Sequence, residues 1–356
     1  MNPVESFAIP ETAREARWWD AAPDGRVHCF LCPRHCRLRD GQAGFCAVRA
    51  NRAGRLVSLV YGQPAAVHVD PIEKKPLHHF LPGTSVLSLG TTGCDLACSF
   101  CQNWDLSRSL PGRAETRALT PAGVVALALE NGCPSIAFTY NEPTVWAEYL
   151  LDICAEAHAR GLATVMVTNG YVTPEAFHDL YDHVDAANVD LKSLSDEFYR
   201  RHTLAHLAPV LETLRRLRAE TGVWVEVTNL LIPTLNDAED DVRRLAEWVC
   251  AELGPDVPLH FSAFHPEYKL RDVPPTPPGT LRVARRIARE AGLRYVYEGN
   301  VLGNGTHTFC ADCGRLLIQR AWHEVVENRL EQGCCPDCGR AVPGRWQRPG
   351  ARGAHA

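Results

Sequence analysis

Three groups of closely spaced cysteines constrain this chain more than any other feature of its sequence. The 356 residues contain 15 cysteines, and eleven of them form groups at Cys29, Cys32, Cys36 and Cys46, at Cys94, Cys98 and Cys101, and at Cys310, Cys313, Cys335 and Cys338. The first residues lack the apolar segment of a secretory signal, and the chain has no run of about 18 apolar residues that would suit a membrane span. We therefore expect a cytoplasmic protein with reduced thiols, in which grouped cysteines indicate metal sites rather than disulfides.

Composition excludes two classes of partner. Hydrophobic residues make up 46% of the chain and charged residues 22%, which is ordinary for a globular protein. The net charge is −5, and no basic run is interleaved with aromatic residues. Such a chain has no electrostatic reason to bind nucleic acid or an anionic membrane, so we expect neither as a partner.

The middle of the chain alternates short β-branched runs with helical patterns, which predicts an α/β fold with a parallel sheet. The predicted strands are residues 85–91, 135–140, 163–168, 185–191, 223–232 and 257–264, and the predicted helices are 121–131, 143–160, 196–220, 237–252 and 280–291. Six units are too few for a closed eight-stranded barrel. We therefore predict a partial (β/α)6 TIM-type barrel, although a doubly wound sheet also fits. In either fold the chemistry belongs at the C-terminal ends of the strands.

Cysteine-rich segments flank this predicted core. Residues 1–83 form an N-terminal Cys-rich segment, 84–300 the core barrel, 301–346 a zinc-ribbon-like module, and 347–356 a tail that we expect to be disordered.

The segment GTTGCDLACSFCQNW, residues 90–104, directly follows the first predicted strand. Its spacing, C-x3-C-x2-C, supplies three thiolates, whereas structural zinc sites and closed ferredoxin-type clusters take four. Three thiolates predict a [4Fe–4S] cluster in which one iron keeps an open coordination site. The alternatives are a zinc site completed by a distant histidine, or core cysteines without metal.

This loop resembles that of the radical S-adenosylmethionine (SAM) superfamily. Further motifs resemble the pyruvate formate-lyase activating enzyme-like radical SAM protein of the AmmeMemoRadiSam system: DPIEKKPLHHFLPG (70–83), TYNEPT (139–144), VTNGY (167–171), VDLKS (189–193), LIPTLND (231–237), HFSAFHPEYK (260–269) and YVYEGNV (295–301). The resemblance implies that the open iron binds the amino and carboxylate groups of SAM. Reduction then cleaves SAM to methionine and a 5′-deoxyadenosyl radical, which abstracts a hydrogen atom.

The resemblance also implies partners. A flavodoxin- or ferredoxin-like reductant would supply the electron, and the hydrogen would come from a glycine of a partner protein. Memo-like and AMMECR-family proteins are the partners that the AmmeMemoRadiSam system suggests, and another protein or a small molecule within that system is an alternative substrate. A further alternative is a non-catalytic zinc-ribbon scaffold.

Six polar residues near predicted strand ends are candidate site residues. By resemblance, Asn141, Glu142, Thr168 and Asn169 help to bind SAM, and Asp190 and Lys192 face the reaction. The structural alternatives are a helix cap for the first pair and an internal ion pair for the third, while Gly170, which follows the second pair, could simply be a turn residue.

The two outer cysteine groups each offer four thiolates. Cys310, Cys313, Cys335 and Cys338 have the C-x2-C-x21-C-x2-C spacing of a zinc ribbon, so we predict structural zinc, with a second iron–sulfur cluster or no metal as alternatives. For Cys29, Cys32, Cys36 and Cys46 both zinc and an auxiliary [4Fe–4S] cluster are chemically suitable, and we favour zinc.

Overall fold

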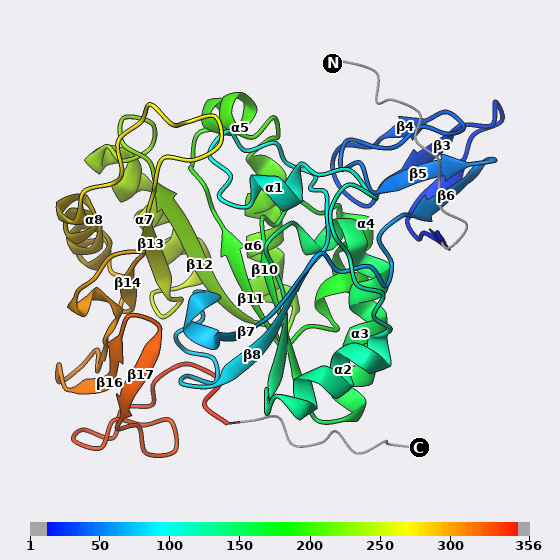
Figure 1. The fold of residues 1–356 in the computed structure, drawn as a ribbon. Helices are drawn as coiled ribbons and strands as arrows, with labels where there is room; N and C mark the ends of the chain where they lie inside the picture. Colours follow the sequence, from blue (N-terminus) through cyan, green and yellow to red (C-terminus); the bar gives the residue numbers. More distant parts are fainter. Residues whose placement is uncertain (1–12, 348–356) are drawn as a thin grey trace.

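The computed structural model describes residues 13–347 and is built around one large sheet (Figure 1). The sheet has eight strands in the order β14-β13-β12-β11-β10-β9-β8-β7. All neighbours are parallel except the antiparallel edge pair of β7 and β8. The strands are β7 Ala66–Pro71, β8 Ser85–Gly90, β9 Ser135–Phe138, β10 Ala163–Thr168, β11 Ala186–Asp190, β12 Trp224–Leu231, β13 Leu259–Ala263 and β14 Val296–Gly299.

Helices connect the parallel strands and cover the outer face of the curved sheet (Figure 1). They are α1 Trp104–Ser107, α2 Pro121–Glu130, α3 Ala147–Ala159, α4 Pro174–Tyr181, α5 Asp196–His202, α6 Ala208–Glu220, α7 Glu239–Leu253 and α8 Pro278–Glu290, and a short 3-10 helix, η2 Pro143–Trp146, precedes α3. The parallel strands are almost fully buried because helices cover one face and the barrel interior the other. At the start of α2, the Thr120 hydroxyl accepts a hydrogen bond from the Gly123 amide at 3.1 Å, so Thr120 caps this helix.

The predicted α/β class and parallel sheet are confirmed, and the observed order discriminates between the two predicted architectures. A doubly wound sheet reverses its strand order at a switch point, whereas these strands follow the chain without reversal. Two strands of the large sheet were not predicted: β14, which extends the parallel series, and β7, which lies inside the predicted N-terminal segment. Within the described residues β7 and β14 occupy opposite ends of the order, so this barrel is open on one side.

The helical predictions differ from the structure in one division and two omissions. The single helix expected at 196–220 is two helices, α5 and α6, because Leu204 adopts a left-handed backbone conformation with φ of 54° and ends the first of them. The helices α1 and α4 were not predicted. No helix among residues 13–347 is long and apolar enough to cross a membrane.

The N-terminal unit consists of two small sheets, one ordered β1-β6-β5 and the other β2-β3-β4. The strands are β1 Arg14–Glu15, β2 Trp19–Ala21, β3 Val27–Cys29, β4 Arg37–Leu38, β5 Arg49–Arg52 and β6 Arg55–Ser58. This unit lies beside α3 and α4 (Figure 1). A buried ion pair between Arg49 and Glu148 of α3, at 2.9 Å, and a 2.7 Å hydrogen bond from the Thr173 hydroxyl to the Phe30 carbonyl hold it there.

The C-terminal module is a three-stranded sheet of β15 Thr308–Phe309, β16 Leu316–Ala321 and β17 Glu324–Asn328. Arg320 of β16 is fully buried and donates to the His78 carbonyl at 2.8 Å, close to the buried carboxylate of Glu73. The amide of Arg345 donates to the His79 carbonyl at 2.7 Å. The module is therefore fixed to the segment that leads into β8. Of the predicted disordered tail, residues 348–356 lie outside the described residues.

Candidate functional site

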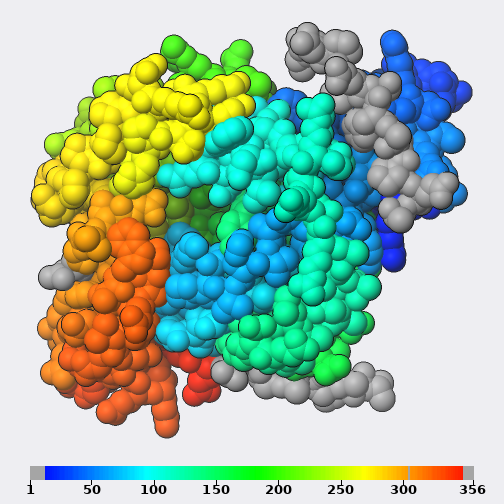
Figure 2. Space-filling view, viewed as in Figure 1, coloured from blue at the N-terminus to red at the C-terminus, as the bar shows by residue number. Residues whose placement is uncertain are grey.

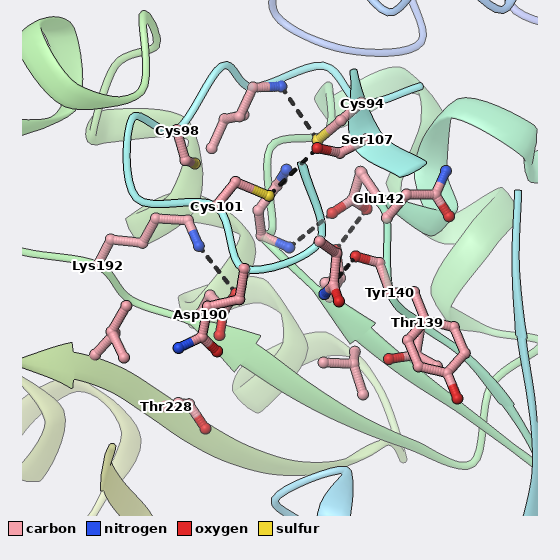
Figure 3. Close-up of a pocket in the computed structure, with 18 of the residues that line it drawn as sticks. Cys94, Cys98, Cys101, Ser107, Thr139, Tyr140, Glu142, Asp190, Lys192 and Thr228 are labelled. Atoms are coloured by element: carbon pink, nitrogen blue, oxygen red, sulfur yellow. Dashed lines mark hydrogen bonds and ion pairs between the residues drawn. The ribbon is translucent and has the colours of Figure 1, made fainter. Parts of the chain in front are cut away.

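The three central cysteines lie where the sequence analysis expected chemistry, on the loop that leaves the C-terminal end of β8 (Figure 3). Cys94, Cys98 and Cys101 line one cavity of about 230 Å³. Two glycines let this loop approach its neighbours. A Cβ on Gly90 would lie 2.7 Å from the Thr139 carbonyl, and a Cβ on Gly93, at φ +84°, would lie 2.3 Å from the Cys46 carbonyl.

Asn141 holds the start of the cysteine loop. Its side-chain oxygen accepts from the Thr91 amide at 3.0 Å, and its amide nitrogen donates to the carbonyls of Thr92 at 3.1 Å and Gly93 at 2.8 Å. The same nitrogen lies 3.0 Å from the Thr91 hydroxyl. Asn141 lines the cavity, but its polar atoms are engaged with the loop, so the contacts assign it a positioning role.

Glu142 joins β10 to the segment after β9. Its carboxylate accepts from the Thr144 amide and hydroxyl at 3.0 and 2.7 Å, from the Thr168 hydroxyl at 2.7 Å, and from the Asn169 amide at 2.7 Å. Glu142 also caps η2, which is the structural alternative considered from the sequence. Burial raises its pKa although these four donors favour the carboxylate.

A second acidic residue, Asp95, lies within the cysteine loop. Asn169 donates to one of its oxygens at 2.8 Å, while the other, Oδ2, is buried without a partner among the described residues. Burial, followed by the nearby charge of Glu142, raises the pKa of Asp95 to about 8. Asp95 was not predicted as a site residue, and its only signal in the sequence is its position between Cys94 and Cys98.

Asp190 and Lys192 both line the cavity at the end of β11 and form an ion pair of 2.9 Å (Figure 3). Burial opposes the charged ammonium, but the Asp190 carboxylate and the Cys98 thiolate outweigh burial and raise the pKa of Lys192. The lysine is therefore a cation that faces the cysteine loop. Thr228 adds a buried hydroxyl to the same wall, and this hydroxyl has no hydrogen-bond partner in the described part of the chain.

The arrangement of the sulfur atoms fits the group that the spacing predicts. Zinc holds four thiolates about 2.3 Å away and therefore about 3.8 Å from one another. Within residues 13–347, the one group of three or more candidate ligands whose donor atoms all lie within 4.8 Å of one another is that of Cys310, Cys313, Cys335 and Cys338. The three central thiols line one cavity but do not form a group of this kind, and a cubane does not require one because each thiolate binds a different iron.

The C-terminal cysteines have the geometry of a tetrahedral metal site. The sulfur atoms of Cys310 and Cys338 are 3.5 Å apart, and those of Cys313 and Cys335 are 3.6 Å apart. The two knuckles are alike in backbone: Gly314 donates to the Cys310 carbonyl, and Gly339 donates to the Cys335 carbonyl. Four cysteines at this spacing are compatible with a metal ion.

A larger cavity of about 1090 Å³ adjoins the cysteine site, and both cavities share Asn103, Tyr140 and Ser262 among their lining residues. Figure 2 shows a hollow on this face, bordered by the segment around residues 70–80 and by the C-terminal module. Residues 321–325 of the module form part of its wall.

A charged cluster in this larger cavity was only partly foreseen. Asp70 accepts from Lys74 at 2.9 Å, from Lys75 at 2.7 Å and from the Tyr140 hydroxyl at 2.7 Å. From the sequence, Lys74 and Lys75 of this DPIEKK segment could contact a substrate carboxylate or a partner, or could belong to a solvated charged loop. Burial lowers the pKa of Lys75 to about 8 although Asp70 favours its charge. Tyr140 has a φ of 71°, a strained value for a residue with a side chain.

Comparison with known proteins also points to a radical SAM protein. The family model described as the Radical SAM superfamily matches residues 88–249. The chain is 45% identical to an uncharacterized protein of Methanocaldococcus jannaschii over 92% of this chain and 98% of that one. It is 24% identical to a pyruvate formate-lyase-activating enzyme of Clostridium pasteurianum over 51% of this chain and 80% of the enzyme.

Among solved structures, a radical SAM methyltransferase from Sphaerobacter thermophilus resembles this chain in fold. The TM-score is 0.50, with 19% sequence identity over 67% of this chain and 71% of the methyltransferase.

Proposed function

Because this chain belongs to the radical SAM superfamily, we propose that it is an enzyme that cleaves SAM reductively and abstracts a hydrogen atom from a substrate. The observation that carries this proposal is the set of three thiols on one loop at the C-terminal end of β8, all facing a single cavity (Figure 3). Cys94, Cys98 and Cys101 would hold a [4Fe–4S] cluster, which would offer SAM an open iron and, after reduction by an external one-electron donor, would supply the electron that cleaves SAM to methionine and a 5′-deoxyadenosyl radical.

The chain's own residues shape and charge the place where SAM would bind. Asn141 fixes the cysteine loop, and Glu142 fixes the wall formed by Thr168 and Asn169. We propose that these four residues form the SAM-binding wall through the surfaces that their internal hydrogen bonds hold in place. Lys192 has further N–H donors beyond its bond to Asp190, and these suit an anionic or carbonyl group of SAM or substrate.

The adjoining cavity supports a large substrate. It is open to the surface, and its wall includes residues 321–325 of the C-terminal module, so that a segment of another protein can reach the cysteine site through it. We propose an activating-enzyme-like reaction in which the hydrogen comes from a glycine of a partner protein. Similarity to a pyruvate formate-lyase-activating enzyme supports this choice.

The partners follow from the same proposal. A flavodoxin- or ferredoxin-like protein would serve as reductant, and Memo-like and AMMECR-family proteins are the protein substrates we would try first. A small-molecule substrate that enters the same cavity is the second candidate, because Asp70, Lys74 and Lys75 present charges there that a small polar molecule could meet.

Binding of SAM to the open iron can be tested by electron paramagnetic resonance. The dithionite-reduced, iron-reconstituted protein should change its spectrum on addition of SAM, and Cys98→Ala should abolish that change. Cys133→Ala is the matched control, since Cys133 is a buried cysteine outside the three groups. If the spectrum of the wild type does not change when SAM is added, the non-catalytic scaffold would be the better account.

The source of the hydrogen atom can be tested separately by isotope transfer. Candidate partner proteins carrying deuterated glycine should give deuterium in 5′-deoxyadenosine when glycine is the donor. Unlabelled nucleoside formed with every labelled partner would exclude the glycine proposal while leaving SAM cleavage intact.

A further inference from the structure

The four N-terminal cysteines differ from the C-terminal four in both spacing and surroundings. Cys29, Cys32, Cys36 and Cys46 line one small cavity of the N-terminal unit. Unlike the C-terminal sulfur atoms, they do not form a group within 4.8 Å of one another, although all four lie in the described part of the chain. A single zinc ion would require spacings of about 3.8 Å.

The N-terminal cysteines can be compared with the three central cysteines of the same chain. Cys94, Cys98 and Cys101 also surround a cavity without meeting the 4.8 Å limit, and they are the ligands expected for a [4Fe–4S] cluster. A cubane separates its thiolates because each binds a different corner iron. The N-terminal four therefore lack the close spacing of the C-terminal four, as do the central three.

The surroundings of the N-terminal cysteines are those of a shielded cofactor. Cys29, Cys32 and Cys46 are buried, and the cavity wall also contains Leu31, Leu38, Phe45 and Val145. By contrast, Cys313 and Cys338 of the C-terminal module are exposed. An apolar wall excludes water from an iron–sulfur cluster and controls its potential.

Two arginines of the cavity wall have unused hydrogen-bond donors. Arg49 is 2% exposed, and its Nε has no partner among the described residues although its other nitrogens bind Glu148 and the Arg17 carbonyl. Arg34 donates through Nε to the Asp95 carbonyl at 2.9 Å, and one of its terminal nitrogens is buried without a partner within residues 13–347. Buried donors of this kind require an acceptor, and the sulfur atoms of an anionic cluster supply acceptors at this place.

We propose that Cys29, Cys32, Cys36 and Cys46 bind a second [4Fe–4S] cluster, a site that stands independently of the reaction proposed above. This revises the zinc ion favoured from the sequence, where a four-cysteine pattern alone does not discriminate between the two. The site lies next to the central one, because Gly93 of the cysteine loop packs against the Cys46 carbonyl and the Val48 side chain.

The test is a metal and sulfide analysis of the full chain after anaerobic reconstitution with iron, sulfide and zinc. The triple variant Cys94→Ala/Cys98→Ala/Cys101→Ala removes the central site and leaves the N-terminal one intact. It should retain about four irons, about four sulfides and one zinc per chain, whereas the wild type should hold about twice as much iron and sulfide. Adding Cys32→Ala and Cys36→Ala to the triple variant should remove the remaining iron and sulfide but not the zinc.

Three results would overturn the proposal: the triple variant binds two zinc ions and no sulfide, it binds one zinc ion and nothing else, or it keeps its iron after Cys32 and Cys36 are replaced. The wild-type iron and sulfide content decides the matter even when a variant fails to fold, since about four of each, rather than about eight, would exclude a second cubane.

A second readout is electron paramagnetic resonance of the reduced wild type. Two neighbouring clusters should give a spectrum broadened by spin coupling, and the triple variant should give a single uncoupled signal.

Discussion

Gly93 is the point at which the cysteine loop meets the N-terminal unit, and its replacement by alanine tests that contact. Its φ is +84°, and an added Cβ would lie 2.3 Å from the Cys46 carbonyl and 2.6 Å from Cγ1 of Val48. The left-handed backbone costs a residue with a Cβ roughly 1–2 kcal/mol. Overpacking of a filled interior adds about 1–3 kcal/mol. Gly93→Ala should therefore destabilise the protein by about 2–5 kcal/mol.

Gly112 is the matched control. Its φ is +81°, nearly that of Gly93, but an added Cβ would have no atom within 4 Å. Gly112→Ala should therefore lower the free energy of unfolding only by the cost of the left-handed backbone, about 1–2 kcal/mol. The difference between the two variants, about 1–3 kcal/mol, isolates the contact with Cys46 and Val48.

Denaturant unfolding of the reconstituted proteins under anaerobic conditions measures these losses, and iron analysis of the same samples shows whether the loop still holds its cluster. We expect Gly93→Ala to lose iron as well as stability, and Gly112→Ala to keep its iron. Equal losses of stability in the two variants, with equal iron, would refute the view that the loop is packed against the N-terminal unit.

Three further predictions follow from the described contacts. Asn141→Ala leaves the backbone groups of residues 91–93 without their buried partner. Denaturant unfolding should show a free energy of unfolding lower by about 2–4 kcal/mol, and iron analysis should show less iron bound at the central cysteines. Burial lowers the pKa of His79 from 6.5 to about 4, so the fold disfavours the protonated ring. The contribution of neutral His79 to the free energy of unfolding is therefore fully present above pH 6.5, and up to roughly 3 kcal/mol of it is lost as the pH falls toward 4. His79→Gln should flatten that part of the pH profile of unfolding, and an unchanged profile would contradict the assignment. Cys338→Ser should release one metal ion and make residues 308–346 sensitive to limited proteolysis, while the iron content stays unchanged.

The features that were predictable from the sequence are those set by local pattern. The spacing of the C-x3-C-x2-C loop is enough to predict a three-thiolate site. The buried strands β8 to β13 are recognisable as apolar runs because both their faces are covered. Thr120 followed by Pro121 marks the start of α2 in the sequence and in the structure. Such signals need no knowledge of what lies beside them.

Features that depend on tertiary neighbours were not predictable. The sequence shows that Asn141 and Glu142 follow a strand, but not that Asn141 faces the carbonyls of residues 91–93 or that Glu142 meets Thr168 and Asn169. Whether a polar side chain at a strand end binds a ligand or a neighbouring loop is decided by which loop lies next to it.

Glu226 illustrates the same limit inside the barrel. It lies on a predicted strand, yet the structure shows that its carboxylate accepts from the backbone amides of His78 and His79 and contacts the ring of His260 at 2.6 Å. These partners are far apart in the sequence, so no local pattern could connect them. The edge strand β7 was missed for a related reason, because only its antiparallel pairing with β8 identifies it.

The most direct test of the central claim is the formation of 5′-deoxyadenosine. Reconstituted protein is reduced with dithionite in the presence of SAM, and the nucleoside is quantified by chromatography and mass spectrometry. The account predicts nucleoside from the wild type and from Cys133→Ala, and none above background from Cys98→Ala. If reduced, cluster-loaded wild-type protein gave no nucleoside even with the proposed Memo-like and AMMECR-family proteins present, radical SAM catalysis by this chain would be contradicted.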